Sequence, residues 1–427
     1  MLTKLRIQNF KSLQDTGDLA IRPLTFLVGP NSSGKSSVLQ MLLMLRQTVL
    51  SSDVESPLVT NGPFIEVGAY PDFVFRHEAE RKLEVATEWG EADPLAGGPM
   101  QVRAALRYDS TTTQILLAES EFRLRETFGE SVRETDGGTY AGEAWRLGKD
   151  GRKVTQTLPG IRPLWWFFET TESLISGRTP IVVFSPRGIL RWHMVRMAHL
   201  GPLRPYPRRF YPITGQNPAE VGSSGEWAFE VLWADNQSSD EQAGRLLQEV
   251  REWLSKFAIA ESVRLDRLGE SNQYEVVVTD PATKTEASFA DIGFGASQVL
   301  PIVVQSFFAR PASTLLVEQP EIHLHPKAQA ELGDLFIAAA KSRDRAFIIE
   351  THSEHILARI RRRIAEGVPG ITRDMVAIYY FEPTREGTKI RPVTLKENGQ
   401  YEDYPSGFFE EDFEEALKHL EAMSKRP

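Results

Sequence analysis

The chain has 427 residues, of which 41% are hydrophobic and 25% are charged, a composition typical of globular proteins. It contains no cysteine. This excludes disulfides, cysteine nucleophiles and thiolate-bound metals, and it fits a reducing cytoplasm, where we expect the protein. The net charge of -9 argues against a surface that binds nucleic acid everywhere, although it leaves room for a local basic patch. We find no apolar run of about 18 residues and therefore expect no membrane partner.

The first 50 residues predict a strand, a turn, a second strand, a glycine-rich loop and a helix. Leu5 and Ile7 alternate with polar neighbours, as in a half-buried strand. Residues 24–28 form a continuous apolar run, which indicates a central strand buried on both faces. After the loop, apolar residues recur at helical spacing, namely Val38, Leu42, Leu45 and Val49.

Between this strand and this helix, residues 29–36 (GPNSSGKS) fit the P-loop pattern without a mismatch. The glycines let consecutive backbone N–H groups point at phosphates, and the helix N-terminus adds its dipole. Lys35 is predicted to bind the β- and γ-phosphates of ATP, and Ser36 is predicted to bind Mg²⁺. We expect the remaining nucleotide contacts from Asn31, Ser32, Ser33, Gly34 and Ser37.

The middle of the chain changes character twice. Residues 63–158 are mainly β by their pattern, whereas residues 159–257 are rich in Trp, Arg and Pro. A hairpin then leads to a glycine turn at Gly293–Gly295. We expect strands at 81–89, 100–108, 114–124, 274–279 and 285–290, and a helix at 241–256.

From about residue 290 helices and strands alternate, which predicts parallel sheet units and an α/β fold. A strand at 313–317 is followed by Glu318, and a strand at 346–349 is followed by Glu350 and His352. Ligands bind at the carboxyl edge of such sheets, and P-loop enzymes place a carboxylate there near Mg²⁺. We therefore expect three strand ends to converge on one nucleotide site.

The order of P-loop, glycine turn, acidic strand end and strand-end histidine resembles that of ABC-type ATPases. Asn31 and the opening segment Ile7–Ser12 are similar to the soluble branch that contains the SMC, RecF and overcoming-lysogenization-defect (OLD) ATPases. The segments Glu318–Pro326 and Glu350–Ser353 look most similar to the OLD-like and Septu-type defence ATPases. The resemblance covers residues 1–50 and 290–366.

The resemblance implies a P-loop ABC-type head with a mixed sheet. The composition between its two blocks adds a β-rich lobe and a helical, arginine-rich insertion to the predicted α/β fold. It also implies roles for single residues: Glu318 near Mg²⁺, His352 as sensor of the γ-phosphate, and Lys11 among the nucleotide-binding residues. Residues 293–298 occupy the signature turn, which contacts ATP bound to the opposite protomer through Gly293, Gly295 and Ser297. ATP would then be held between two head-to-tail protomers that separate after hydrolysis.

This sequence departs from the family pattern at three positions of the expected nucleotide site. The signature turn lacks the leading serine of the family, and whether Ser297 replaces it is open. No glutamine marks a Q-loop, so Asp72 or His77 are the candidates for that region.

The third departure concerns the general base. Gln319 stands where the family has a glutamate, and an amide orients a water but does not accept its proton. Phosphoryl transfer depends mostly on positioning and charge stabilisation, so we expect slow hydrolysis, with Glu321 or Glu350 as substitute carboxylates.

Two other clusters leave more than one interpretation. Four histidines lie near these strand ends: His323, His325, His352 and His355. Their spacings are compatible with a zinc site, although we favour loop and nucleotide-sensing roles for them. Residues 173–219 contain interleaved aromatics, no acidic residue and seven arginines: Arg178, Arg187, Arg191, Arg196, Arg204, Arg208 and Arg209. The region between Arg178 and Arg209 suits either nucleic-acid contact or anchoring to an acidic surface.

Two charged runs are interpreted as solvent-exposed helical faces. These are Arg359–Arg363 and the acidic segment 410–421. The acidic segment is also compatible with docking of a basic partner.

We therefore predict four segments and one principal function. The segments are 1–158 and 258–370 as the two halves of the head, 159–257 as the insertion, and 371–427 as closing strands with an acidic helix. The residues after the His352 helix are too few for an appended nuclease, so we expect an ATP-gated dimer or higher oligomer that controls a separate effector, such as a nuclease, in phage defence or DNA repair. The alternatives are an ATP-binding sensor with little hydrolysis and a RecF-like DNA clamp. An SMC-like tether is disfavoured, because it would need long heptad arms and the insertion shows no sustained heptads.

Overall fold

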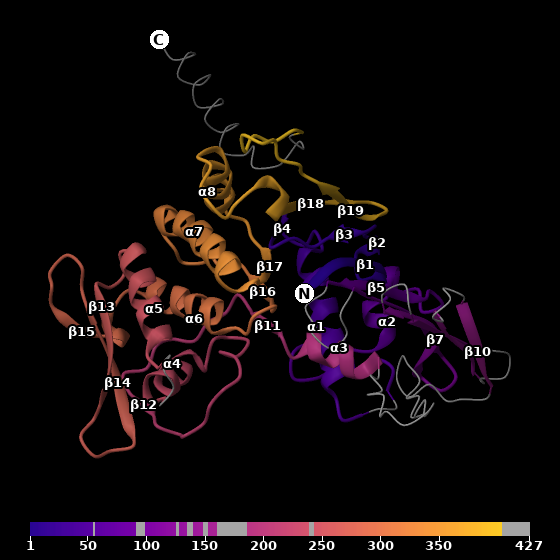
Figure 1. The fold of residues 1–427 in the computed structure, drawn as a ribbon, viewed down its shortest axis with the longest axis horizontal. Coiled ribbons are helices and arrows are strands. Elements are labelled where there is room, and N and C mark those ends of the chain that lie inside the picture. The colour runs from indigo at the N-terminus through magenta and orange to yellow at the C-terminus, as the bar shows by residue number, and fades with distance from the viewer. Residues whose placement is uncertain are drawn as a thin grey trace, which may run out of the picture.

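The computed structural model describes residues 1–53, 56–90, 99–124, 128–134, 140–147, 153–159, 186–238 and 243–403. A central sheet separates a β-rich lobe from a helical lobe (Figure 1). The fold is α/β with a P-loop head, as the sequence predicts. Arg178 and the predicted helix at 410–421 lie outside the described residues.

The central sheet has six strands. The strand that precedes the P-loop lies between two strands from the C-terminal part of the chain. The first five strands in this order are parallel and the last is antiparallel. The predicted strands at 24–28, 313–317 and 346–349 are confirmed to within one residue. The order is β11 (Met197–Leu200), β16 (Thr314–Glu318), β17 (Ala346–Glu350), β4 (Leu24–Val28), β18 (Val376–Thr384) and β19 (Gly387–Pro392).

The two faces of this sheet belong to two different hydrophobic cores. In β4, Phe26 packs into the core that contains α6 (Phe294–Phe308), α7 (Pro326–Arg343) and α8 (Glu354–Ala365). Its neighbour Leu27 packs into the other core, with α1 (Lys35–Leu50) and α3 (Pro186–Met194). Because strand side chains alternate between faces, one strand serves both cores, and β4 is buried throughout as expected.

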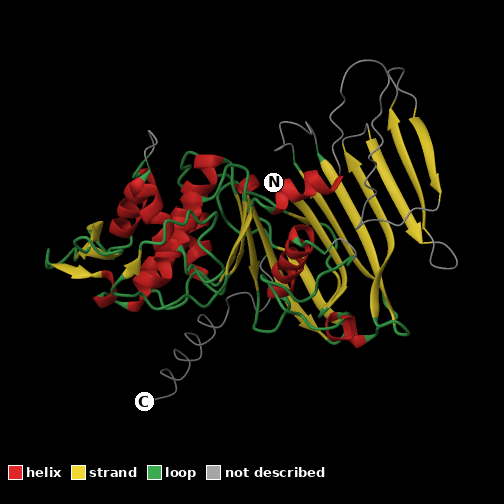
Figure 2. Cartoon of the chain, turned by 90° about the horizontal axis from the view of Figure 1, so that it is seen from below, coloured by secondary structure: helices red, strands yellow, loops and turns green. Residues whose placement is uncertain are grey.

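The β-rich lobe is an antiparallel sheet that closes the second core over α1 (Figure 2). Helix α1 is therefore buried on nearly all sides, which explains why its apolar residues are not confined to one stripe. The predicted strands of this lobe are confirmed. Its order is β10 (Lys153–Pro159), β9 (Tyr140–Leu147), β8 (Phe128–Glu134), β7 (Gln114–Leu124), β6 (Met100–Asp109), β5 (Leu83–Trp89), β1 (Leu2–Phe10) and β2 (Leu13–Asp15), with β3 (Leu19–Ala20) paired to β1.

The helical lobe lies on the other side of the central sheet, and the predicted hairpin before the glycine turn is confirmed in it. Strand β11 falls within the segment 159–257, predicted as an insertion, yet it is the edge strand of the central sheet. The lobe contains β12 (Tyr211–Pro212), α4 (Ala228–Gln237), α5 (Arg245–Lys256), β13 (Ser262–Arg267), β14 (Gln273–Thr279) and β15 (Glu286–Ser288).

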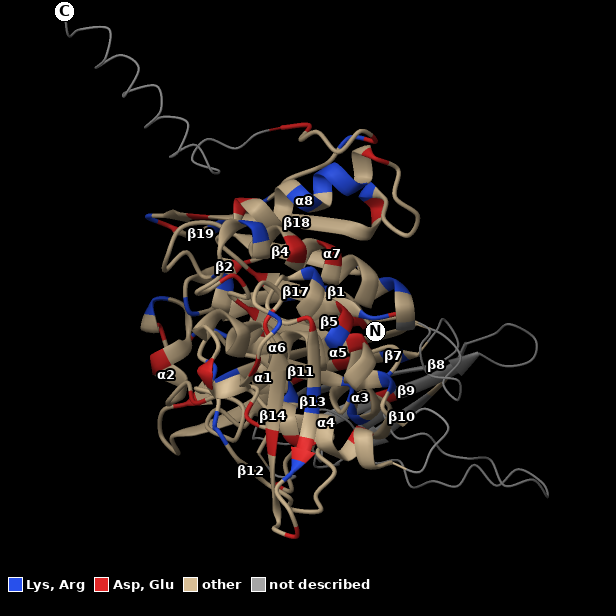
Figure 3. Ribbon diagram, turned by 90° about the vertical axis from the view of Figure 1, so that its left-hand side faces the viewer, with Lys and Arg blue, Asp and Glu red and all other residues tan. Residues whose placement is uncertain are grey.

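The arginine run on α8, visible in Figure 3, is only partly a solvent-exposed face. Arg359 donates to Glu331 at 3.1 Å and to Asp334, and its side chain is 11% exposed. Arg363 donates to Asp334 at 2.7 Å. The expectation of a solvated run was wrong for these two residues because α7 presents acids opposite them.

No helix of the described residues combines the length and the apolar character that crossing a bilayer would require.

The buried Arg345 predicts a strong stability effect. Its guanidinium donates to the carbonyls of Ser306, Phe307 and Ala309, which are unpaired acceptors at the C-terminal end of α6. Arg345→Met would leave these carbonyls buried without donors, so we expect the free energy of unfolding in urea to fall by about 3 kcal/mol. The exposed Arg310→Met is the matched control, and an equal loss there would contradict the explanation.

Candidate nucleotide site

The P-loop is shaped by backbone and hydroxyl groups from both ends of the chain. At Gly29 (φ 140°) a Cβ would lie 2.5 Å from the carbonyl oxygen of Phe381 in β18, so only glycine fits. The hydroxyl of Thr388 in β19 lies 2.8 Å from the carbonyl oxygen of Ser33 and 2.9 Å from the hydroxyl of Ser12. Thr388 carries no sequence signal for this role, because more than 350 residues separate it from the loop.

Lys35 and Ser36 stand at the start of α1 as the motif requires. The Lys35 ammonium donates to the carbonyls of Gly29 at 2.9 Å and Pro30 at 2.7 Å, and burial lowers the pKa of this ammonium. The Ser36 hydroxyl donates to Glu350 Oε1 at 2.9 Å. A phosphate would offer Lys35 an anionic partner in place of these two neutral carbonyls.

The other loop residues differ in their exposure. Asn31 and Ser32 are exposed, and Ser32 has a left-handed φ of 60°. Ser33 is fully buried and its hydroxyl has no hydrogen-bond partner. Ser37 is also buried. The loop thus presents Asn31 and Ser32 to solvent, whereas the predicted contacts Ser33 and Ser37 are buried.

The acidic strand ends converge next to the loop. Glu318 of β16 and Glu350 of β17 are aligned in register. Burial raises the pKa of Glu350, whose Oε2 has no partner. Gln319 has a φ of 43° and donates its backbone N–H to the Glu350 carbonyl at 2.8 Å. Buried carboxylates with unused oxygens are a setting that favours a bound cation.

Glu321 and His352 link the two strand ends. Glu321 Oε1 accepts the backbone N–H of His352 at 2.6 Å, and burial raises the pKa of Glu321. His352 is exposed at the surface, but part of its ring is shielded from water. This desolvation is the main cause that lowers the pKa of the imidazole, and the charge of Lys35 lowers that pKa further. The structure therefore brings the predicted histidine to the same edge as Lys35.

Two residues that sequence reasoning did not assign to the site contact Glu318. His199 Nε2 of β11 lies 2.7 Å from Glu318 Oε1. Arg204 donates to the Glu318 carbonyl at 3.2 Å, and burial lowers the pKa of Arg204 to about 10. In the sequence, Arg204 stands out only as one of seven arginines. Its position follows from the pairing of β11 with β16, which no local pattern indicates.

The glycine turn lies at the start of α6, where its contacts are with other loops. Ser297 is buried, and its hydroxyl donates to the Phe294 carbonyl of the same helix at 2.7 Å. A Cβ at Gly295 would lie 3.2 Å from the His323 carbonyl oxygen. The Phe294 ring is tilted against the Tyr206 ring and meets the His323 ring in a T-shaped contact. Gly293 has open space around it.

The remaining candidates have local partners. Lys11 donates to Gln40 of α1 at 2.5 Å. Asp72 accepts the Ala69 N–H, and His77 lies 2.7 Å from the Pro71 carbonyl oxygen. His325 caps α7. Within the described part of the chain, no three His, Asp or Glu side chains form a metal-binding group.

Several of the described arginines also have local partners. Arg209 lies 2.6 Å from Asp291, and Arg196 lies over the Trp192 ring at 3.7 Å. The contact of Arg209 with Asp291 anchors the segment to the rest of the protein, whereas that of Arg196 stays within the segment. Nucleic-acid contact stays a prediction.

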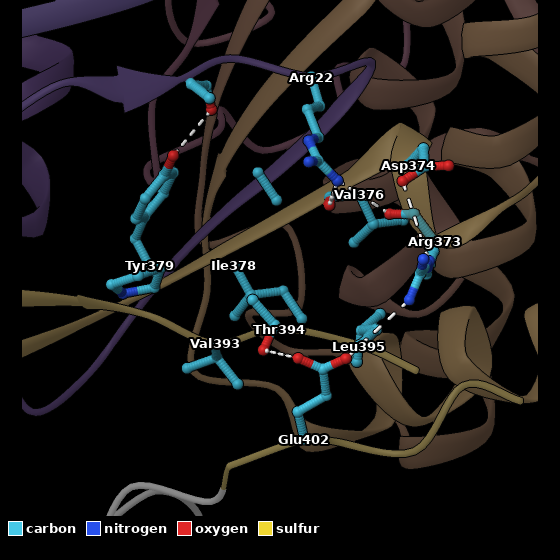
Figure 4. Close-up of a pocket in the computed structure, with 13 residues that line it drawn as sticks. Arg22, Arg373, Asp374, Val376, Ile378, Tyr379, Val393, Thr394, Leu395 and Glu402 are labelled. Carbon is cyan, nitrogen blue, oxygen red and sulfur yellow. Dashed lines mark hydrogen bonds and ion pairs between the residues drawn. The ribbon is translucent and has the colours of Figure 1, made fainter. Parts of the chain in front are cut away.

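A separate cavity of about 210 Å³ lies at the opposite edge of the central sheet (Figure 4). There Arg22 donates to the carbonyls of Arg373 and Val376, and Thr394 donates to Glu402 at 2.8 Å. It forms where β4 and β18 begin, whereas the P-loop follows the end of β4. This cavity is therefore not part of the nucleotide site.

Three family models match segments of the chain. Residues 1–85 match "AAA ATPase domain", and residues 207–358 match "AAA domain, putative AbiEii toxin, Type IV TA system". Residues 371–419 match "Protein of unknown function (DUF3696)". The P-loop and the acidic strand ends thus lie in segments that match AAA-family ATPase domains. None of the curated proteins matches the chain.

Solved structures with a similar fold include SMC head domains. The head domain from Thermotoga maritima is 11% identical, with 92% of this chain and 99% of that chain covered and a TM-score of 0.42. An Smc head bound to the C-terminal winged-helix domain of ScpA is 14% identical, with coverages of 92% and 98% and a TM-score of 0.46. An Smc head with an extended coiled coil, bound to the C-terminal domain of ScpA derived from Pyrococcus furiosus, is 13% identical, with 99% of each chain covered and a TM-score of 0.41.

The contact between Ser36 and Glu350 predicts which carboxylate matters most for Mg²⁺. We expect Glu350→Gln to weaken Mg²⁺-dependent binding of a slowly hydrolysed ATP analogue by about tenfold or more, because a carboxylate of the ion's shell is lost. Fluorescence titration with Mg²⁺ and with a chelator measures the effect, and unchanged binding in chelator shows that the loop is intact. A larger effect from Glu318→Gln would instead place the ion nearer Glu318.

Proposed function

We propose that this chain binds Mg²⁺-ATP in the P-loop and hydrolyses it slowly, and that the nucleotide state controls the association of two protomers. The observation that carries the proposal is the contact of Ser36 with Glu350, which joins the P-loop to the acidic edge. The family matches over residues 1–85 and 207–358 support the same assignment.

The residues around the loop fit the groups of Mg²⁺-ATP. Lys35 would bind the β- and γ-phosphates, because its present partners are only two carbonyls. Ser36, Glu350 and Glu318 would hold Mg²⁺ together with phosphate oxygens and water. Mg²⁺ usually takes one or two carboxylates plus phosphates, and Glu350 and Glu318 lie side by side at this edge.

Slow turnover follows from the residue after the acidic strand. Gln319 would orient the attacking water without accepting its proton. Glu321 is buried and accepts the His352 N–H, so a carboxylate in that position serves mainly to place His352 near the γ-phosphate. In this proposal His352 and Lys35 sense the phosphate, and the missing base limits the rate.

The ATPase proposal is tested by phosphate release. Wild type should release phosphate slowly, Lys35→Ala should fall to background, and Gln319→Glu should be faster by about tenfold or more because it supplies a base. Intact secondary structure in circular dichroism is the control for each variant. Equal rates for wild type and Lys35→Ala would refute hydrolysis by this site. The alternative would then be an ATP-binding sensor, which the missing base at Gln319 also supports.

The second protomer is proposed from the glycine turn. Gly293 opens α6, and a Cβ added at this residue would meet no atom within 4 Å, so the turn is free to approach a nucleotide on another chain. Such a dimer would control a separate effector, such as a nuclease, in phage defence or DNA repair. The biological context rests on the resemblance of residues 318–326 and 350–353 to the defence ATPases.

Light scattering tests the dimer. With Mg²⁺ and a slowly hydrolysed ATP analogue the mass of wild type should double, while Gly293→Glu should stay monomeric because its carboxylate would meet the partner's phosphates. Gly293 has a φ of -54°, so a side chain there brings no backbone strain. Ser271→Glu, an exposed change in the same lobe, is the matched control. A nucleotide-independent mass for wild type would refute the switch.

A further inference from the structure

The helical lobe contains a second cavity, of about 510 Å³, that the nucleotide site does not use. It lies between α4, β14, the loop 212–218 and the end of α6. Helix α4 and strand β14 are on the left of Figure 1. This volume is in the range of small-ligand pockets, and it is far larger than the space of a single water.

Aromatic rings form one wall of this cavity. The Trp233 ring of α4 stacks on Tyr274 of β14, with ring centroids 4.4 Å apart and planes at 21°. Phe308, the last residue of α6, also lines it. Stacked rings offer a flat apolar surface whose faces attract a cation.

Two buried polar groups of the cavity lack partners. Tyr274 is fully buried, and its hydroxyl makes no hydrogen bond. Glu230 Oε2 is also buried and unpaired. An unsatisfied buried hydroxyl or carboxylate is costly, and native proteins retain few of them, so each one calls for a partner.

The charge of the lining is entirely acidic. Glu230 and Asp235 line the cavity, and among the described residues that line it none is Lys, Arg or His. Asp235 already accepts the backbone N–H of Leu246 at 3.1 Å, which leaves Glu230 as the unused carboxylate. Burial raises the pKa of Glu230, and Arg208, whose charge acts in the opposite direction, is exposed and does not line the cavity.

We propose that this cavity binds an organic cation, a primary ammonium or guanidinium group on an apolar chain. Neither the Glu230 Oε2 atom nor the Tyr274 hydroxyl has accessible surface in this structure, so the side chains around them would have to shift for the cation to donate hydrogen bonds to them. Its carbon chain would lie against Trp233. The group belongs either to a free polyamine-like molecule or to a Lys or Arg side chain of a peptide. This inference is independent of the ATPase proposal, because every lining residue belongs to the helical lobe or to the end of α6.

The test is calorimetric titration of the full chain with spermidine, with the blocked tripeptide Gly-Arg-Gly, and with n-butanol as an uncharged analogue. We expect saturable 1:1 binding of at least one cation and none of the alcohol. Tighter binding of spermidine assigns a free molecule, and tighter binding of the tripeptide assigns a side chain. Absence of saturable binding of both cations up to about 10 mM overturns the proposal and leaves a water-filled cavity.

Three variants locate the site. Glu230→Gln should weaken cation binding by about tenfold or more and Tyr274→Phe by a few-fold, whereas the exposed Glu252→Gln should leave it unchanged. Tyr274→Phe also removes an unpaired hydroxyl, so it should unfold at the same or a higher temperature than wild type without ligand. That measurement separates lost binding from lost folding. Unchanged affinity in Glu230→Gln would overturn the assignment of the site.

Discussion

The insertion of β17 between β4 and β16 is the constraint on which the nucleotide site depends. Because β17 pairs in parallel with both neighbours, the carboxyl ends of all three strands reach one edge of the sheet. The register aligns Glu318 with Glu350 and brings Glu350 to Ser36, 314 residues earlier in the chain. If the order of the strands were different, the P-loop and the acids would remain separate features.

The conformation of the P-loop likewise comes from distant segments. The β18 backbone leaves no room for a Cβ at Gly29, and Thr388 of β19 holds the Ser33 carbonyl. These contacts order the loop before any ligand arrives, which lowers the entropy that binding must overcome. Helix α1 is enclosed between two sheets, and this packing holds its N-terminus at the P-loop.

The nucleotide site contains buried ionisable groups of both charges. Three carboxylates, Glu318, Glu321 and Glu350, lie at the edge with Lys35 and Arg204 as the nearby cations. Burial raises the pKa of Glu321 and Glu350 and lowers the pKa of Lys35 and Arg204, so each group is held where its charged form is disfavoured. Perturbed groups of this kind gather at functional sites, where a bound ion or phosphate offsets the cost.

The sequence by itself determined the elements that have a local signature. The P-loop, the helix after it, and the apolar strands before Glu318 and Glu350 all follow from spacing and alternation, which depend on neighbours in the chain. Only the tertiary structure decided that His199 and Arg204 contact Glu318, that Thr388 holds the loop, and that Arg359 is paired with α7. These contacts depend on strand order and on the packing of distant segments, for which single residues carry no periodic signal.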